Sequence, residues 1–253
     1  MNSKLSPILE VLHRHASKKM INDLFKSING YCRAYMKDIS RVKRSKKRAE
    51  EHYDKISGYY DYLEGLFEKK YRDHALSMLN IERKDKVLEI GPGTGHALKR
   101  ISETTGSEGY VCGIDISREM LLISKSRLKN NDLFQNSSLI QGDGSNLPIK
   151  DNFLDHCFLS FTLELFDTPD IEKALSEIKR VLKDDGKVSI VSLAKKENIT
   201  VKIYESFHKL FPNAIDCRPI PVSKFLEENG FEIKFSDTDN MMGLPIKIVI
   251  GKK

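Results

Sequence analysis

The chain has 253 residues, of which 40% are hydrophobic and 31% charged, and its formal net charge is +6. This composition is typical of a soluble globular protein, and the length suffices for one α/β domain with an appendage. No apolar run is long enough to span a membrane, no secretory signal is evident, and the four cysteines form neither a disulfide framework nor a zinc pattern. We therefore expect a cytoplasmic protein without a metal site.

Residues 1–48 carry the excess of positive charge, with thirteen Lys or Arg and three acids. Apolar residues recur there at three- and four-residue steps from Leu5 to Ile28, which predicts an amphipathic helix. Such a helix either packs as a cap over the carboxyl edge of the sheet or lies on an anionic membrane as a peripheral contact. We therefore divide the chain into a basic helical extension, residues 1–48, and a main domain, residues 49–253, linked by the solvated charge run Arg41–Arg48.

Patterns along the main domain predict an α/β fold. A helical pattern covers residues 49–80, and a series of strands and helices follows. The predicted strands are 86–90, 110–115, 138–141, 154–160 and 187–193, with helices at 118–130 and 169–182. Strands that alternate with helices imply a parallel sheet. After residue 195, helices at 201–210 and 222–228 precede two strands, 231–236 and 245–250, which are close enough in sequence to pair antiparallel.

The most informative stretch is Val87–Gly95, in which a buried strand runs directly into Gly91, Gly93 and Gly95 and then into a helical pattern. Strand, glycine turn and helix form the nucleotide site at the carboxyl end of the first strand of open α/β sheets. The glycines let a ligand approach without a Cβ in the way. Asp115 ends the next strand, where its carboxylate can accept hydrogen bonds from both hydroxyls of a ribose.

The spacing of the glycines indicates which nucleotide is bound. A dinucleotide loop needs a third glycine where this chain has His96, which disfavours an NAD-dependent oxidoreductase. Here the pattern is G-x-G-x-G, and Glu89 precedes it by two residues. Further along, Asp143 and Gly144 follow the predicted third strand. An acid and a backbone N–H can read the edge of adenine there, although Asp and Gly are also ordinary turn residues.

These motifs, together with Ser160-Phe161 at the end of the fourth strand, resemble the UbiE/COQ5-type branch of the class I S-adenosylmethionine (SAM) methyltransferases. The resemblance extends from Tyr53 to Leu193 and rests on an ordered set of motifs. They are Tyr60-Asp61, Glu89–Gly95, Gly113–Ser117, Gly142-Asp143, Leu147-Pro148, Ser160-Phe161 and Arg180–Gly186. The set is specific for the superfamily and for SAM, and much less specific for the substrate.

The resemblance implies a Rossmann-like, mostly parallel seven-stranded sheet with an antiparallel last strand, and it implies a role for each matching residue. The residues implied to hold the methionine end of SAM are Glu89, Gly91, Gly93, Thr94 and Gly95. Those implied at the ribose, the adenine and the sulfonium are Asp115, Asp143 with Gly144, and Ser160, respectively. In one respect the chain departs from the quinone enzymes. They follow Ser-Phe with a Gly-Leu-Arg-Asn-type stretch, and this chain has Thr162–Leu165 there.

Methyl transfer from a sulfonium is an in-line displacement, so the protein mainly aligns the acceptor, the methyl group and the sulfur. If the acceptor must lose a proton, a base has to lie within hydrogen-bond reach. Glu164 is the first candidate, because it follows Ser160 by four residues and is expected to face the acceptor pocket. His96 and His208 are the other candidates. For all three, a structural or surface role is the competing interpretation.

The predicted function is therefore methyl transfer from SAM to a small-molecule or lipid acceptor, quinone-like or otherwise. Two other functions stay open. A nucleic-acid methyltransferase would explain the basic extension, but the chain has neither an Asn/Asp-Pro-Pro-aromatic motif after the fourth strand nor a Pro-Cys dipeptide. A non-catalytic SAM-binding module would carry the same cofactor residues. No pattern indicates an oligomeric state.

Overall fold

The computed structural model describes residues 39, 41–42, 44–196, 199–210 and 217–253, apart from the side chains of 59–66, 199 and 207–210. Residues 1–40 and 41–253 form two compact units, and every helix and strand described below belongs to the second. The helix predicted between Leu5 and Ile28 lies outside the described residues. Among the helices of the described ranges, none is long and apolar enough to cross a membrane.

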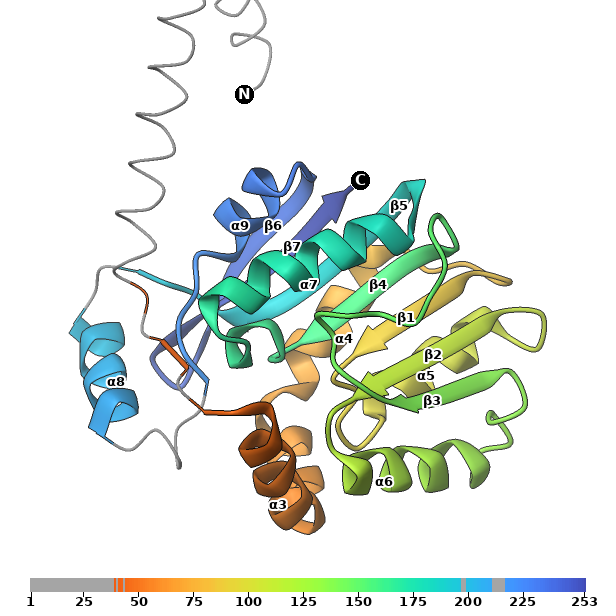
Figure 1. Cartoon of the computed structure of the whole chain (residues 1–253), viewed down its shortest axis with the longest axis horizontal. Helices are drawn as coiled ribbons and strands as arrows, with labels where there is room; N and C mark the ends of the chain where they lie inside the picture. The colour runs from red at the N-terminus through yellow and green to blue at the C-terminus, as the bar shows by residue number, and fades with distance from the viewer. Residues whose placement is uncertain (1–38, 40, 43, 197–198, 211–216) are drawn as a thin grey trace, which may run out of the picture. The chain divides into compact units, whose positions relative to one another are not determined.

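A seven-stranded sheet forms the centre of the second unit (Figure 1). Its strands are β1 (Lys86–Ile90), β2 (Tyr110–Asp115), β3 (Ser137–Gln141), β4 (Leu154–Ser160), β5 (Leu182–Leu193), β6 (Glu232–Met241) and β7 (Leu244–Lys252). From edge to edge their order is β3-β2-β1-β4-β5-β7-β6. Neighbouring strands are parallel except at β7, which is antiparallel to both β5 and β6. The predicted fold class is therefore confirmed.

Helices cover both faces of this sheet. The described helices are α3 (Lys46–Phe67), α4 (Lys69–Leu79), α5 (His96–Thr105), α6 (Arg118–Lys129), α7 (Thr168–Val181), α8 (Ile199–Leu210) and α9 (Val222–Glu228), with a 3-10 turn η1 (Leu163–Leu165). In Figure 1, α7 and α9 lie in front of the sheet, and α4 and α5 lie behind it. Helix α6 contacts β2 and β3, and α3 packs on α6 and α4. The second unit begins at Arg41 and α3 begins at Lys46, both before the predicted boundary between residues 48 and 49. The division into a basic extension and a main domain stays a prediction.

The central strands are buried on both faces, which explains their continuous apolar sequences. Four consecutive residues of β1, Val87–Ile90, are buried, as is typical of a parallel strand covered by helices on both sides. Along α4, Tyr71, Ala75 and Leu79 recur at four-residue steps and are buried. They join one apolar cluster with residues of β4, β5 and β7. This core fixes the strand ends at which the site is built.

Two boundaries differ from the expectation. The predicted helix over residues 49–80 is divided at Glu68, between α3 and α4. Strand β5 begins at Leu182, five residues before its predicted start at residue 187, so Asp184–Gly186 lie within the strand. Leu182 pairs with Leu154, both are fully buried, and the register then shifts before the next pair. Burial of the two leucines favours strand pairing over a longer helix, and the residues in between form a bulge.

Candidate active site

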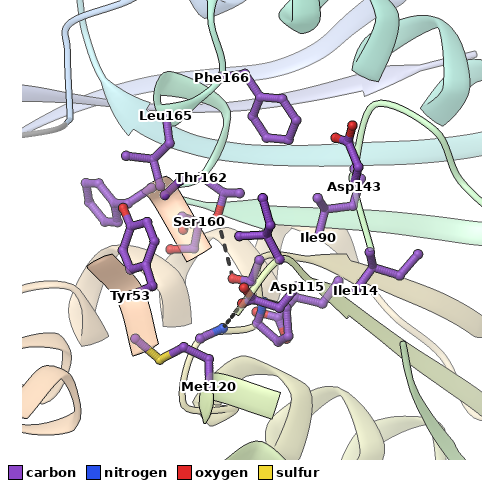
Figure 2. A pocket seen from close by; sticks show the side chains of 18 of the residues that line it. Tyr53, Ile90, Ile114, Asp115, Met120, Asp143, Ser160, Thr162, Leu165 and Phe166 are labelled. Atoms are coloured by element: carbon purple, nitrogen blue, oxygen red, sulfur yellow. Dashed lines mark hydrogen bonds between the residues drawn. The ribbon is translucent and has the colours of Figure 1, made fainter. Parts of the chain in front are cut away.

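Strand β1 lies where the sheet order reverses, with β2 and β3 on one side and β4 and β5 on the other. In open α/β sheets, ligands bind beyond the carboxyl ends of the strands at such a switch point. A pocket lies there, lined by the segments after β1, β2, β3 and β4 and by residues at the start of α3 (Figure 2). Seven residues predicted to bind the cofactor line it: Glu89, Gly91, Gly93, Asp115, Asp143, Gly144 and Ser160.

The glycine turn after β1 brings three strand ends together. Gly91 has φ +69° and Gly95 has φ +84°, in the left-handed region that other residues enter only at a cost. A Cβ on Gly91 would lie 2.5 Å from the Cγ2 of Thr162, which comes from the segment after β4. The Gly91 N–H donates to the carbonyl of Ile114 in β2 at 2.8 Å. The turn therefore requires glycine both for its backbone conformation and for this close approach.

Asp115 is the last residue of β2 and is only 9% exposed. Its Oδ2 accepts from the Gly93 N–H at 3.1 Å, and its Oδ1 accepts from the Ser117 N–H at 2.9 Å. Burial raises the pKa of Asp115 to about 6, the backbone N–H donors partly oppose this shift, and the negative charge of Asp54 adds to it. The carboxylate is thus fixed in orientation and keeps lone pairs for the hydroxyl groups of a ligand.

Asp143 and Gly144 form the wall beyond β3. A Cβ on Gly144 would lie 2.5 Å from the Cγ2 of Ile90, so no larger residue fits there. Asp143 accepts from the Ser145 N–H at 2.9 Å and pairs with the Lys46 ammonium. Burial raises the pKa of Asp143, but Lys46 and Ser145 outweigh burial and hold that pKa below its ordinary value. Asp143 is therefore ionised at neutral pH and can accept from an amine.

The chain turns sharply after β4. Phe161 has φ +50°, a conformation that costs about 1–3 kcal/mol for a residue with a side chain and often occurs at functional sites. The turn carries Thr162 over the glycine turn, and the Thr162 Oγ1 donates to the Ser160 carbonyl at 2.9 Å. The Ser160 Oγ is buried and has no hydrogen-bond partner among the described residues. Leaving a buried hydroxyl unpaired is costly, so this position suits a polar ligand atom.

Thr94, Gly95 and His96 were also predicted at the site and do not line the pocket. Thr94 is fully buried, and its carbonyl accepts from the Arg127 Nε at 2.8 Å. Gly95 is the N-cap of α5, and His96 is the first residue of that helix. Thr94 and Gly95 therefore shape the turn from behind. The side chain of His208, in α8, lies outside the described residues.

Glu164 does not face the pocket, contrary to the expectation. It lies in η1 and is fully buried, and its Oε1 accepts from the N–H of Leu193, at the end of β5, at 3.1 Å. Its neighbours Thr162 and Leu165 line the pocket instead, because a tight 3-10 turn directs successive side chains to different sides. The predicted orientation of Glu164 is wrong. A base has to reach the proton that it removes, and Glu164 is turned away from the pocket.

One side of the pocket is closed by a segment that no sequence pattern had indicated. The charge run was expected to be a solvated linker, but Val42 and Lys46 line the pocket. Arg41 donates from Nε and Nη2 to the two oxygens of Asp167 at 2.7 and 2.5 Å, and the Val42 N–H donates to the same carboxylate at 3.1 Å. Most charge runs are exposed to solvent. The spacing of the basic residues in this run does not show which of them form ion pairs with distant acids.

Aromatic and apolar side chains form the remaining wall. In Figure 2, Tyr53, Met120, Leu165 and Phe166 surround the same space as Asp115 and Ser160. The guanidinium of Arg44 lies over the ring of Tyr53, 5.4 Å from its centroid. One side of the pocket thus offers acceptors for hydroxyl and amine groups. The other side offers apolar surface, which suits a flat, apolar molecule beside a nucleoside.

Comparisons with known proteins agree with this geometry. The model of the ubiE/COQ5 methyltransferase family matches residues 40–216. The demethylmenaquinone methyltransferase of Lactobacillus johnsonii is 30% identical over 172 residues, which cover 66% of this chain and 70% of that protein. The enzyme of the same name from Staphylococcus epidermidis is 32% identical over 170 residues, covering 66% of this chain and 67% of that protein.

The fold is also similar to that of a SAM-dependent methyltransferase from Aquifex aeolicus. The TM-score is 0.55 at 22% identity, over 83% of this chain and 99% of that chain. The pocket fits SAM by its own chemistry, with a fixed carboxylate, a glycine turn without Cβ atoms and a buried hydroxyl that has no described partner. The family match includes all three of these features. The chain therefore belongs to the ubiE/COQ5 methyltransferase family and is a SAM-dependent methyltransferase.

Proposed function

We propose that residues at the carboxyl ends of β1, β2 and β3 bind SAM. Asp115 accepts hydrogen bonds from the two ribose hydroxyls, and Asp143 with the Gly144 N–H holds the edge of adenine. The Gly91–Gly95 turn lies against the methionine end. One observation carries this assignment: the Asp115 carboxylate is nearly buried in a pocket wall, and backbone N–H groups of Gly93 and Ser117 fix its orientation.

The reacting end of the site lies at β4 in this proposal. SAM supplies a methyl group that its sulfonium already activates, so the protein has to align the acceptor with it. Ser160, whose buried Oγ has no described partner, lies beside the sulfonium, and Glu89 faces the ammonium. The rings of Phe161 and Phe166 exclude water from the line between acceptor and methyl group. Glu164 is not assigned as a base, because its carboxylate contacts the Leu193 N–H.

The acceptor that this site favours is a small quinol-like ring. Two observations support this assignment. The relatives described above are named demethylmenaquinone methyltransferases, and Tyr53, Leu165 and Phe166 give this chain an apolar wall next to the proposed sulfonium position. The stretch Thr162–Leu165 differs from the Gly-Leu-Arg-Asn-type stretch of the quinone enzymes. We therefore expect the same class of acceptor with a different preference among ring substituents.

An activity assay tests this proposal. The purified full chain is incubated with SAM and either demethylmenaquinol or its oxidised quinone, and the products are analysed by mass spectrometry. We expect a methylated product from the quinol alone, because only the reduced ring is rich enough in electrons to attack a methyl group. SAM binding without turnover of the quinol would contradict the acceptor assignment. If no other small acceptor were methylated either, a non-catalytic SAM-binding module would be favoured.

We also propose that the basic extension, residues 1–48, brings the enzyme to anionic membranes. The support is its sequence, in which the apolar stripe Leu5–Ile28 is surrounded by Lys and Arg. Flotation of the full chain with vesicles of neutral or anionic phospholipid tests the idea. We expect binding to the anionic vesicles only, weakened by salt. Equal recovery with both vesicle types, or with neither, would exclude this role.

A further inference from the structure

Arg218 is a fully buried arginine behind the pocket. Its side chain is 0% exposed and is among the largest buried side chains of the described residues. It lies just past residue 216, where the family match ends. Its segment is attached to the end of β5, because the Ile220 N–H donates to the Leu193 carbonyl at 3.0 Å and the Lys195 N–H donates to the Ile220 carbonyl at 3.2 Å.

The Arg218 guanidinium is bonded to the segment after β4 at three positions. Its Nε donates to the carbonyl of Glu164 at 3.2 Å, its Nη2 to the carbonyl of Phe166 at 2.5 Å, and its Nη1 to the Oγ1 of Thr168 at 3.0 Å. The side chain of Glu164 adds a fourth link, to the N–H of Leu193. Residues 164–168 are therefore attached to the end of β5 through two buried charged side chains.

This segment, residues 164–168, forms part of the pocket wall. Leu165, Phe166 and Asp167 line the pocket, while Glu164 and Arg218 lie behind them and do not. Asp167 also receives the bidentate contact from Arg41. The segment overlaps the stretch Thr162–Leu165, where the sequence departs from the Gly-Leu-Arg-Asn-type stretch of the quinone enzymes. Its shape is thus set by contacts that lie outside the shared motifs.

Burial of a guanidinium costs desolvation free energy. Burial lowers the pKa of Arg218 to about 10, although the charges of Asp167 and Glu164 oppose the shift. An apolar side chain of similar volume would fill the same space without this desolvation cost. What a guanidinium adds is a rigid fork of donors that can bind several carbonyl and hydroxyl oxygens at fixed angles. The buried charge therefore favours a role in fixing backbone geometry.

We propose that Arg218 and Glu164 are positioning residues that hold residues 164–168 as the acceptor wall of the pocket and so determine which ring the enzyme accepts. This inference rests on the proposed function for the identity of the acceptor. The proposed contacts to the ribose, the adenine and the methionine end of SAM lie at the ends of β1, β2 and β3, whereas the Arg218 guanidinium donates to Glu164, Phe166 and Thr168, in the segment after β4. Loss of the Arg218 hydrogen bonds is thus expected to weaken binding of the acceptor much more than binding of SAM.

The experiment compares Arg218→Met with Arg180→Met. Arg180 is the control, because it also donates to two backbone carbonyls, those of Leu147 and Ile149, and neither of these two residues lines the pocket. Hydrogen exchange is followed in peptides that cover residues 161–168 and 89–96, SAM affinity is measured by calorimetry, and kcat and KM are measured with demethylmenaquinol. Arg218→Lys and Glu164→Gln are milder variants in case Arg218→Met does not fold.

We expect Arg218→Met to raise exchange in residues 161–168 and to raise the KM for demethylmenaquinol at least about tenfold, with kcat and SAM affinity within about threefold of the parent. Glu164→Gln is expected to raise KM by a smaller factor. Arg180→Met is expected to change neither the hydrogen exchange of residues 161–168 nor the KM. The proposal would be overturned if SAM affinity fell as much as KM rose in the Arg218 variants. Unchanged hydrogen exchange in residues 161–168 would also overturn it. If the parent does not methylate demethylmenaquinol, the proposed acceptor is wrong, and loop exchange with SAM affinity still decides the positioning role.

Discussion

Asp115 is nearly buried and is the residue proposed to hold the ribose of SAM. Its ionisation can therefore be followed through the pH dependence of SAM affinity. Its pKa is raised to about 6, chiefly by burial, above its ordinary value. In the unliganded protein the proton is therefore bound more readily than in the unfolded chain. Ribose hydroxyls donate to the ionised form, so SAM binding has to lower this pKa again.

From this linkage we predict that SAM binds about tenfold more weakly at about pH 5 than at about pH 7, because protonation then removes most of the competent carboxylate. Calorimetry over this range measures the effect. The control is Asp115→Asn, which should bind SAM weakly at every pH and show no such slope. A parent profile as flat as that of Asp115→Asn would show that the Asp115 carboxylate is not linked to SAM.

Gly91 is a second residue with a measurable constraint. Its φ is +69°, and an added Cβ would meet the Thr162 side chain at 2.5 Å. We predict that Gly91→Ala lowers the free energy of unfolding by about 1–3 kcal/mol, from the left-handed backbone and from the clash together. Denaturant unfolding measures this loss.

The clash and the backbone cost can be separated with a double variant. Thr162→Ala removes both side-chain atoms that lie nearest the added Cβ. The Gly91→Ala/Thr162→Ala protein should therefore be more stable than the sum of the two single effects predicts. Simple additivity would mean that Thr162 is not the obstacle.

At the scale of elements, Asp167 connects the start of α7 to the segment before α3. It caps the helix by accepting from the Thr168 N–H, and it also accepts from Arg41 and from the Val42 N–H. Arg41 is 56% exposed, so its ion pair contributes little to stability. The hydrogen bonds to backbone N–H groups matter more.

We therefore predict that Asp167→Ala lowers the free energy of unfolding by about 1–2 kcal/mol through loss of the helix cap. Asp167→Asn keeps an acceptor for the cap and should lose less than half as much. Urea unfolding at neutral pH compares the two variants. Equal losses would assign the stabilisation to the charge, contrary to this account.

The elements themselves follow from local sequence. The apolar run Val87–Ile90 and the glycine turn after it predict β1 and its turn, and the alternation of strands with helices predicts a parallel sheet. The start of β5 was not predicted, because the pairing of Leu182 with Leu154 depends on a contact between distant parts of the chain. A local pattern of Asp184–Gly186 indicates a turn, and the burial of the two leucines outweighs it.

The site shows the same division between local and distant information. Asp115 and Gly91 were predicted at the pocket because a strand end fixes where its next residue points. Glu164 was misplaced because one turn of 3-10 helix rotates its side chain toward β5. Arg41 and Arg218 were missed because their partners, Asp167 and Phe166, are 126 and 52 residues away in the sequence, and no periodic pattern marks such pairs.

At the scale of the whole molecule, the sheet order places the ends of β1, β2 and β4 around one pocket, in which we propose that SAM binds. A ligand that binds only the folded state stabilises it by mass action. SAM at about one hundred times its Kd should add about 2.7 kcal/mol, which for a domain of this size raises Tm by roughly 5–10 °C. Thermal unfolding with NAD is the control and should show no shift. An equal shift with NAD would indicate a less selective nucleotide site.

Calorimetric titration of SAM into the parent and Asp115→Ala tests whether the Asp115 carboxylate holds SAM. Hydrogen bonds to a charged group contribute about 1.5–3 kcal/mol, so affinity should fall at least about tenfold. Asp155→Ala is the matched control, because Asp155 also accepts from a backbone N–H, that of Lys86, but at the opposite edge of the sheet. We expect parent-like binding for Asp155→Ala and weak binding for Asp115→Ala. Equal affinity of Asp115→Ala and the parent would show that Asp115 does not hold SAM.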